Sequence, residues 1–279
     1  MNKIPNKIGP FMLDDSDTTM EYGYYYKAEF NVPFSENIRT IRVWIPENYD
    51  FENKDITFPV MYFSDGQNLV NKYLTAFGDW GLDKVAHKLL IEDNISFIAV
   101  GIDSPKDDLK RSNELNPPFK VDYDKRMNPY GDKFIDFIAD ELKLVIDKHF
   151  NTKCEKEYTA IAGSSMGGIM AFYAGVLRKD TFSFALDFSP AFLLYKIRNW
   201  KKLLDSFNMN PDDNVKHYLY VGGKKFERIF VRHTKYTYKY LKELGFSDDM
   251  VTLDIDKPMI HHESAWNKHL GQAIKFWLK

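Results

Sequence analysis

One serine of this chain stands in a sequence context that makes a hydroxyl group nucleophilic. Residues 163–167 read Gly-Ser-Ser-Met-Gly, which fits the pattern Gly-x-Ser-x-Gly. In that pattern the serine occupies a sharp turn between a strand and a helix, and the flanking glycines remove Cβ atoms that would clash. Ser165 fits the pattern, whereas Ser164 would need glycine where Ala162 and Met166 stand. Ser165 is therefore the candidate nucleophile, provided that a strand precedes it and a helix follows it.

A nucleophilic serine needs a base, and the histidines late in the chain are the candidates. With this serine motif the order along the chain is serine, acid, histidine. His261 and His262 lie in a predicted loop between the last strand and the last helix, where the base is expected. The other histidines after Ser165 fall at a strand start or inside predicted helices, at positions 217, 233 and 269. Chain position alone leaves both His261 and His262 open as the base.

No sequence motif singles out the acid that orients the histidine. It is expected after the predicted strand at residues 216–221, because reacting groups gather at the carboxyl ends of parallel strands. The loop there begins Gly-Gly-Lys-Lys-Phe, and Glu227 is its first carboxylate. We take Glu227 as the acid, and keep Asp187, near the end of the preceding strand, and Asp256 as alternatives.

Two backbone N–H groups are expected to stabilise the negative charge that develops on an attacked carbonyl oxygen. The first is that of Met166, directly after the candidate nucleophile. The second is expected in residues 64–68, Ser-Asp-Gly-Gln-Asn, which follow a predicted strand. Gly66 allows a sharp turn there, and we assign the second donor to Gln67.

The elements expected around these residues alternate between strand and helix. Residues 22–30 and 38–45 are rich in β-branched and aromatic side chains and predict an antiparallel hairpin. The alternation that follows is typical of an α/β fold, with a mostly parallel central sheet covered by helices on both faces. The later strands are predicted at residues 58–63, 95–102, 158–162, 182–188, 216–221 and 251–255, and the helices at 80–90, 131–150, 168–177, 229–244 and 265–278. Ser165 thus has its strand before it and its helix after it.

Length and composition favour one domain that binds neither nucleic acid nor membranes. The chain has 279 residues, of which 44% are hydrophobic, enough for a large core. We expect a single domain over residues 1–279, with loop excursions at about 103–129 and 190–214 that serve in binding. The net charge of −2 creates no field that favours nucleic acid or anionic membranes. No apolar run is long enough to span a bilayer.

A few further features of the sequence indicate the cellular compartment and whether a metal or cofactor is expected. Residues 1–19 contain no apolar segment, so no signal peptide is expected. Cys154 is the only cysteine, which excludes an internal disulfide and favours a cytoplasmic protein. The run His261-His262-Glu263 lacks the i, i+4 spacing of a zinc-binding helix. We therefore expect neither a metal nor a cofactor.

Several segments together resemble the putative-esterase, or esterase D-like, branch of the α/β-hydrolase superfamily. This branch includes ferric-enterobactin esterases, feruloyl and acetylxylan esterases, and mycolyltransferases. The resemblance covers most of the chain and rests on residues 42–46, 60–69, 80–83, 100–103 with Arg111 and Glu114, 162–168 and 261–266. It implies an α/β-hydrolase fold and a reaction on esters.

The resemblance also assigns roles to individual residues. The segment His-His-Glu-Ser-Ala-Trp is similar to the family's His-x-Glu-x-x-Trp pattern and selects His261 as the base. The family often carries Gly-x-x-acid after the penultimate strand, and Lys225 stands where that acid would fall. We also expect Arg111 to pair with Glu114 and hold the excursion at 103–129. The matching segments imply substrate contacts from Asp65, Gly66, Trp80, Arg111 and His262.

The sequence thus predicts a serine hydrolase of carboxylic esters that works through an acyl-enzyme. Ser165 attacks the ester, His261 transfers the proton, and Glu227 orients His261. The expected partner is a small-molecule ester, such as a siderophore, a feruloyl ester or an acetylated sugar, and a homo-oligomer is compatible with the sequence. The alternatives are acyl transfer to a sugar or other alcohol by the same residues, and a non-catalytic binding protein of the same fold.

Overall fold

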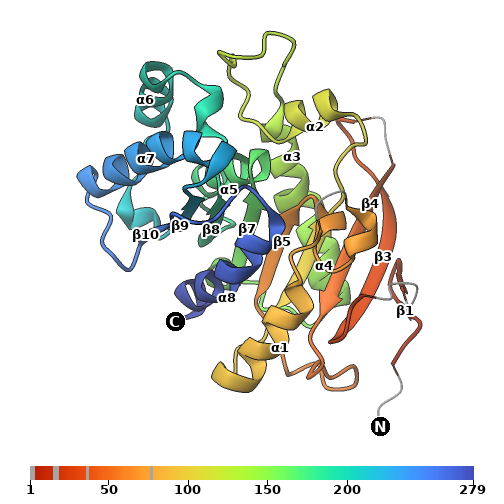
Figure 1. Cartoon of the computed structure of the whole chain (residues 1–279). Coiled ribbons are helices and arrows are strands. Elements are labelled where there is room, and N and C mark those ends of the chain that lie inside the picture. The colour runs from red at the N-terminus through yellow and green to blue at the C-terminus, as the bar shows by residue number, and fades with distance from the viewer. Residues whose placement is uncertain (1–3, 15–18, 36–37, 76–77) are drawn as a thin grey trace.

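A ten-stranded β-sheet forms the centre of the molecule (Figure 1). The computed structural model describes residues 4–14, 19–35, 38–75 and 78–279. The sheet order is β1-β2-β3-β4-β6-β5-β7-β8-β9-β10, antiparallel up to the β4–β6 pair and parallel beyond it. The strands are β1 (Lys7–Ile8), β2 (Phe11–Leu13), β3 (Tyr24–Asn31), β4 (Ile38–Ile45), β5 (Val60–Ser64), β6 (Ile98–Ile102), β7 (Thr159–Ser164), β8 (Phe184–Phe188), β9 (Lys216–Gly222) and β10 (Val251–Asp256).

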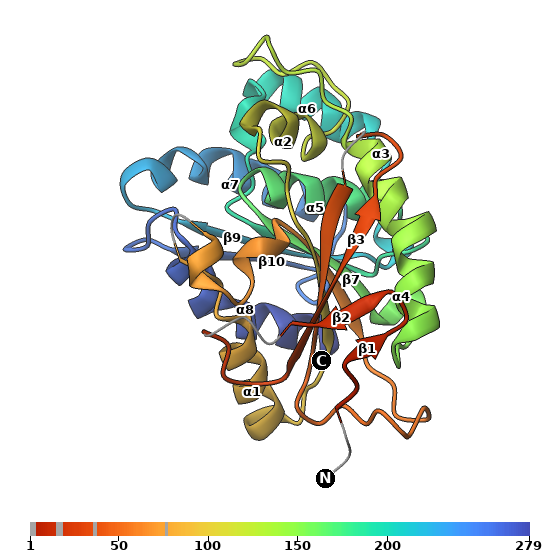
Figure 2. The same cartoon turned by 90° about the vertical axis from the view of Figure 1, so that its right-hand side faces the viewer.

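Helices cover both faces of the sheet. Figure 2 shows α1 and α8 on one side of it and α5 and α7 on the other. Strands β5 to β8 are buried along their whole length, as expected for parallel strands with helices on both faces. The α-helices are α1 (Leu82–Asp93), α2 (Asp108–Glu114), α3 (Gly131–Asp136), α4 (Lys143–His149), α5 (Met166–Leu177), α6 (Ile197–Ser206), α7 (Val231–Glu243) and α8 (Glu263–Leu278).

Shorter helical turns connect these elements, and two of them reach the site described below. The first is η1 (Gly66–Asn68), which follows β5, and the second is η7 (Lys225–Ile229), which follows β9. The others are η2 (Lys72–Leu74), η3 (Phe137–Leu142), η4 (Lys156–Tyr158), η5 (Phe192–Leu194) and η6 (Pro211–Asp213).

The expected mostly parallel sheet with an antiparallel N-terminal hairpin is confirmed, with additions. β3 and β4 form the hairpin, and the short strands β1 and β2 extend its edge. Both predicted excursions contain a helix, α2 in the first and α6 in the second. The predicted helix at 131–150 is interrupted by η3, a π-helical turn between α3 and α4. Its i→i+5 bonding is a backbone feature that a 3.6-residue apolar pattern does not encode.

The carboxyl ends of β5, β7, β8, β9 and β10 meet at one edge of the sheet, because these strands run parallel. Loops and helix starts that follow parallel strands therefore converge there, which is where such sheets bind ligands. None of the helices in the described ranges is both long and apolar enough to cross a membrane.

Candidate active site

Ser165 lies at the turn between β7 and α5 with strained backbone angles. Its φ of 59° and ψ of −114° lie outside the regions that residues with a side chain ordinarily adopt. A Cβ atom on Gly163 would collide with the carbonyl group of Gly167, so the close approach requires glycine. The Ser165 N–H donates to the Phe188 carbonyl (2.8 Å), and the Ser165 carbonyl accepts from the Ala191 N–H (2.9 Å). Bonds to β8 and the loop after it thus hold this residue in its strained turn.

The two predicted oxyanion donors lie at the start of helical turns. Met166 is the first residue of α5, and Gln67 lies in η1. N–H groups in the first turn of a helix have no intrahelical acceptor and are suited to bind negative charge. The Gln67 side chain is fixed by Ser104, whose Oγ accepts from Nε2 (2.9 Å) and whose N–H donates to Oε1 (3.1 Å). These bonds hold η1 against the loop that follows β6.

An ion pair joins the loop after β5 to α2. Arg111 donates from Nε and Nη2 to the two carboxylate oxygens of Asp65, at 2.6 and 2.7 Å. Burial opposes ionisation of Asp65, but the Arg111 guanidinium outweighs it and holds the pKa of that carboxyl below its usual value. Arg111 also donates from Nη1 to the Met166 sulfur (3.8 Å). The predicted Arg111–Glu114 pair is wrong, because the buried Glu114 bonds Arg39 on β4 instead (2.6 and 3.0 Å).

A chain of hydrogen bonds connects α8 to the loops after β8, β9 and β10. His261 Nδ1 lies 2.5 Å from Oε2 of Glu227. Oε1 of Glu227 accepts from the Ser189 hydroxyl (2.5 Å) and from the Gly222 N–H (2.9 Å). The Ser189 oxygen in turn accepts from Nε1 of Trp266 (3.0 Å). Glu227 is fully buried, and these partners satisfy a carboxylate that would otherwise destabilise the fold.

The alternative acids lie apart from the histidine. Asp187 is buried in β8, where its Oδ2 lies 3.1 Å from Nδ1 of His217. Asp256 bonds two side chains of α8 at 2.6 and 3.0 Å. Of these three carboxylates, only Glu227 bonds His261 within the part of the chain that the structure describes. The turn η7 brings it there, two positions beyond the place where the family pattern locates an acid.

Aromatic rings fix the plane of the His261 imidazole. Phe230 stacks on it, with ring centroids 4.8 Å apart and planes 25° apart. Trp266 meets it edge-on at 5.2 Å, and Phe226 does so at 5.7 Å. The ring is thus held by packing as well as by its bond to Glu227.

Ser165 and His261 line the same cavity, which has a volume of about 430 Å³. Its wall combines the loops after β5, β6, β7 and β10 with the starts of α2 and α8. Among the residues predicted to contact substrate, Asp65 and Arg111 belong to this wall. The lining residues are Asp65, Gln67, Asn68, Leu74, Thr75, Ser104, Pro105, Asp108, Arg111, Ser164, Ser165, His261, Glu263 and Trp266.

Three other residues predicted to contact substrate are placed behind or beside this wall. Gly66 is buried in η1. Trp80 is buried and stacks on Phe188, with centroids 5.4 Å apart and planes 6° apart. His262 caps α8, where its Nδ1 accepts from the Ser264 N–H (3.1 Å). None of the three is among the described residues that line the cavity, and their contacts are with the elements that form its wall.

Sequence reasoning missed Ser189, Phe230 and Glu263. Ser189 directly follows β8, and a polar residue at the carboxyl end of a parallel strand is a usable signal. Glu263 belongs to the His-x-Glu-x-x-Trp segment, where no role was assigned to it. No local pattern marks Phe230 as a partner of His261. In the described ranges, no three His, Cys, Asp or Glu side chains form a group that could hold a metal ion.

Comparison with known proteins identifies the family of the chain. A sequence profile described as Putative esterase matches residues 35–240. The chain belongs to the putative esterase family. Membership places it among the carboxylic ester hydrolases. The uncharacterized protein YbbA of Bacillus subtilis (strain 168) is 21% identical to this esterase over 253 residues, which covers 86% of this chain and 92% of YbbA.

Solved structures of esterases share the fold. A ferulic acid esterase superposes with a TM-score of 0.67 at 17% identity, over 92% of this chain and 98% of that one. The enterobactin esterase FES from Shigella flexneri gives 0.69 at 17% identity, over 91% of this chain and 58% of that one. The siderophore hydrolase EstB from Aspergillus nidulans gives 0.66 at 16% identity, over 89% and 94%. The α/β-hydrolase fold expected from the sequence is thereby confirmed.

Proposed function

We propose that this putative esterase cleaves its substrate through an acyl-enzyme, with Ser165 as nucleophile, His261 as base and Glu227 as the acid. The contact between Glu227 and His261 carries the proposal, since it supplies an orienting carboxylate beside the cavity that Ser165 lines. The strained turn at Ser165 adds support, because that geometry exposes a nucleophilic hydroxyl. With Nδ1 engaged by Glu227, the imidazole has Nε2 available to accept a proton.

Each group then has one task. His261 takes the Ser165 proton as the hydroxyl oxygen attacks the ester carbonyl, and returns it to the leaving alcohol. The N–H groups of Met166 and Gln67 stabilise the oxyanion, each by about 3 kcal/mol. A water molecule then attacks the acyl-enzyme while His261 takes its proton, and His261 passes that proton to the Ser165 oxygen as the acyl–oxygen bond breaks and the carboxylic acid leaves. Glu227 keeps the ring in its tautomer and stabilises the imidazolium form.

The substrate class is a small-molecule ester. A cavity of about 430 Å³ has the volume of a small-ligand site. The names of the structural relatives add ferulate and siderophore esters as candidates. Acyl transfer to an alcohol would use the same residues, and product analysis with a competing alcohol separates it from hydrolysis. The contact between Glu227 and His261 favours a catalytic protein over a non-catalytic binding protein of the same fold, because binding alone does not require an oriented histidine.

Ser165→Ala tests the proposal directly. Hydrolysis of p-nitrophenyl acetate and butyrate is expected to fall by at least about 10³-fold, because the variant has no nucleophile. A fluorophosphonate should add one adduct mass to the wild-type protein, and peptide mass spectrometry should locate it on Ser165. The variant should remain unmodified.

Ser164→Ala is the matched control, because it removes the adjacent hydroxyl and leaves the Gly-x-Ser-x-Gly frame intact. It is expected to keep full covalent labelling at Ser165. Equal hydrolysis by wild type and Ser165→Ala, or labelling that depends on Ser164, would end the proposal.

A further inference from the structure

Glu263 is a buried carboxylate in the wall of the cavity that Ser165 and His261 line. It is the first residue of α8, and 5% of its surface is exposed. Within the described ranges its carboxylate forms no hydrogen bond or ion pair with the side chain of another residue; its own backbone N–H is its hydrogen-bond donor. Buried carboxylates in proteins are normally paired. This one lines a cavity that is large enough for a small ligand.

The surroundings of Glu263 leave its negative charge undercompensated. Burial raises the pKa of the Glu263 carboxyl; its own N–H and the charges of His262 and His261 oppose that rise without cancelling it, and the charge of Asp65 adds to it. The positive end of the α8 dipole favours the ionised form. A cation in the cavity would supply the missing partner.

Acidic side chains predominate among the charged residues of the cavity wall. Asp65, Asp108 and Glu263 contribute carboxylates, and Arg111 contributes the one guanidinium. That guanidinium is already engaged by both oxygens of Asp65. No lysine is found among the described residues that line the cavity. Asp108 and Glu263 form no ion pair within the described ranges, so the charged groups of the wall leave an excess of negative charge.

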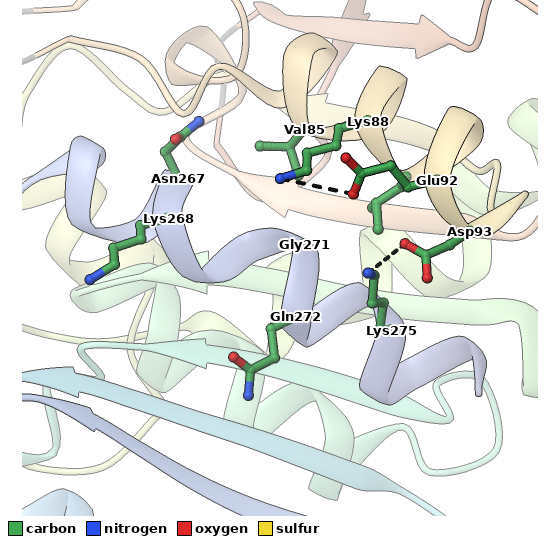
Figure 3. Close-up of a pocket in the computed structure, with 10 residues that line it drawn as sticks. Val85, Lys88, Glu92, Asp93, Asn267, Lys268, Gly271, Gln272 and Lys275 are labelled. Atoms are coloured by element: carbon green, nitrogen blue, oxygen red, sulfur yellow. Dashed lines mark ion pairs between the residues drawn. The ribbon is translucent and has the colours of Figure 1, made fainter.

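A second cavity, between α1 and α8, shows how carboxylates are neutralised elsewhere in the molecule (Figure 3). It has a volume of about 520 Å³. There Glu92 lies 3.9 Å from the ammonium of Lys88, and Asp93 pairs with Lys275. Both carboxylates in that wall pair with a lysine, whereas within the described ranges Glu263 pairs with no lysine or arginine.

We propose that Glu263 binds a cationic group of the substrate, so that this esterase prefers esters that carry a positive charge in their acyl or alcohol part. The inference rests on the proposed function of Ser165 and adds the charge class of its substrate. A cation near Glu263 forms a charge pair in a partly desolvated site. An anionic ester would instead meet Glu263 and Asp108 with a charge of the same sign.

The test compares esters of equal shape and different charge. In the alcohol series, butyrylcholine is compared with its neutral isostere 3,3-dimethylbutyl butyrate and with anionic 2-sulfoethyl butyrate, with pH-stat detection. In the acyl series, the p-nitrophenyl ester of 4-(trimethylammonio)butanoate is compared with that of 5,5-dimethylhexanoate. In at least one series we expect kcat/KM for the cation to exceed that for the neutral isostere by about tenfold. The preference should decline as ionic strength rises.

Variants assign this preference to one side chain. Glu263→Gln should bring the ratio of cationic to neutral kcat/KM close to one, while Glu263→Asp, which keeps the charge, should retain most of it. Glu92→Gln removes the same charge from the cavity between α1 and α8 and should leave the ratio unchanged. A merely structural role of Glu263 would change the rates for all esters together and leave their ratio intact.

The outcomes separate this inference from the proposed function. If no ester is hydrolysed and Ser165 is not labelled, the proposed function itself fails. If neutral esters are hydrolysed through Ser165 without a cation preference in either series, the inference alone is overturned. It is also overturned if Glu263→Gln lowers kcat equally for cationic and neutral esters, because Glu263 would then act through the structure or through His261 and not on the charge of the substrate.

Discussion

At the scale of single residues, two adjacent histidines differ in what they touch. His261 bonds Glu227 through Nδ1 and lies in the cavity wall. His262 accepts the Ser264 N–H and caps α8. We propose that the first transfers protons, whereas the second caps the start of a helix, although the two residues are adjacent in the chain.

His261→Ala is therefore expected to lower kcat for p-nitrophenyl butyrate by about 10²–10⁴-fold, the usual contribution of a general base. His262→Ala should keep kcat within a few-fold of wild type. It should lower the free energy of unfolding by about 1 kcal/mol, the usual contribution of a helix cap. Steady-state kinetics and urea denaturation of both variants check this. Loss of turnover in His262→Ala alone would show that His262 is the base and that the assignment of His261 is wrong.

Glu263 raises a second point at this scale, because the two proposals assign charge selection and proton transfer to side chains two positions apart. His261 and Glu263 lie on either side of the residue that caps α8. A change in the start of that helix would therefore alter the base and the charge selection together.

At the scale of elements, His269 joins α8 to β10. Its Nδ1 lies 2.6 Å from Oδ2 of Asp254, and its Nε2 lies 3.0 Å from Oδ2 of Asp256. Burial lowers the pKa of the His269 imidazole, but the two carboxylates outweigh burial and raise the pKa above its ordinary value of 6.5. The folded protein thus binds a proton at His269 more tightly than the unfolded chain does.

This difference predicts a pH-dependent contribution to stability. A raised pKa in the folded state stabilises the fold fully below pH 6.5, the ordinary value, and loses that effect as pH rises through the folded-state value. We expect His269→Gln to lower the free energy of unfolding on the order of 1–2 kcal/mol at pH 6. The gap to wild type should narrow in alkaline solution, as measured by urea denaturation at a series of pH values. A gap that widens with rising pH would contradict this account.

At the scale of the whole molecule, stability depends on side chains buried between the sheet and its helices. Ile161 in β7 is fully buried, whereas Ile91 on α1 is 67% exposed. Ile161→Ala should lower the free energy of unfolding by about 2–5 kcal/mol, since it leaves a cavity beneath the site. Ile91→Ala should change it by less than about 0.5 kcal/mol. Equal effects of the two substitutions in urea denaturation would show that the sheet core is not the main source of stability.

Much of this architecture could be predicted because it depends on local patterns. Apolar periodicity located the strands and helices that flank Ser165, and the glycines around it marked the turn. Glu227 could be named as the first carboxylate after β9. The sequence predicted its contact with His261 but kept Asp187 and Asp256 as alternatives, because the loops after β9 and β10 meet only in the folded chain.

The failures have the same physical origin. Arg111 and Glu114 are neighbours in sequence, yet Arg111 pairs with Asp65 and Glu114 pairs with Arg39 on β4. Ion pairs over such distances depend on which elements pack together, and no local pattern encodes that. The short strands β1 and β2 were missed because two or three residues carry too little periodicity to be recognised.

The backbone conformations around the site have one consequence for heat resistance. The described ranges contain seven non-glycine residues with positive φ. Asparagine and aspartate tolerate that conformation better than most residues do. Asp65 and Ser165 line the cavity, and Ser189 and Lys225 lie in the loops after β8 and β9. Such conformations cost on the order of 1 kcal/mol each. Substitutions at these four positions that relieve the strain are expected to raise thermal stability and to lower the rate of hydrolysis. Selection for heat resistance and selection for catalytic rate would therefore oppose each other within the same few loops.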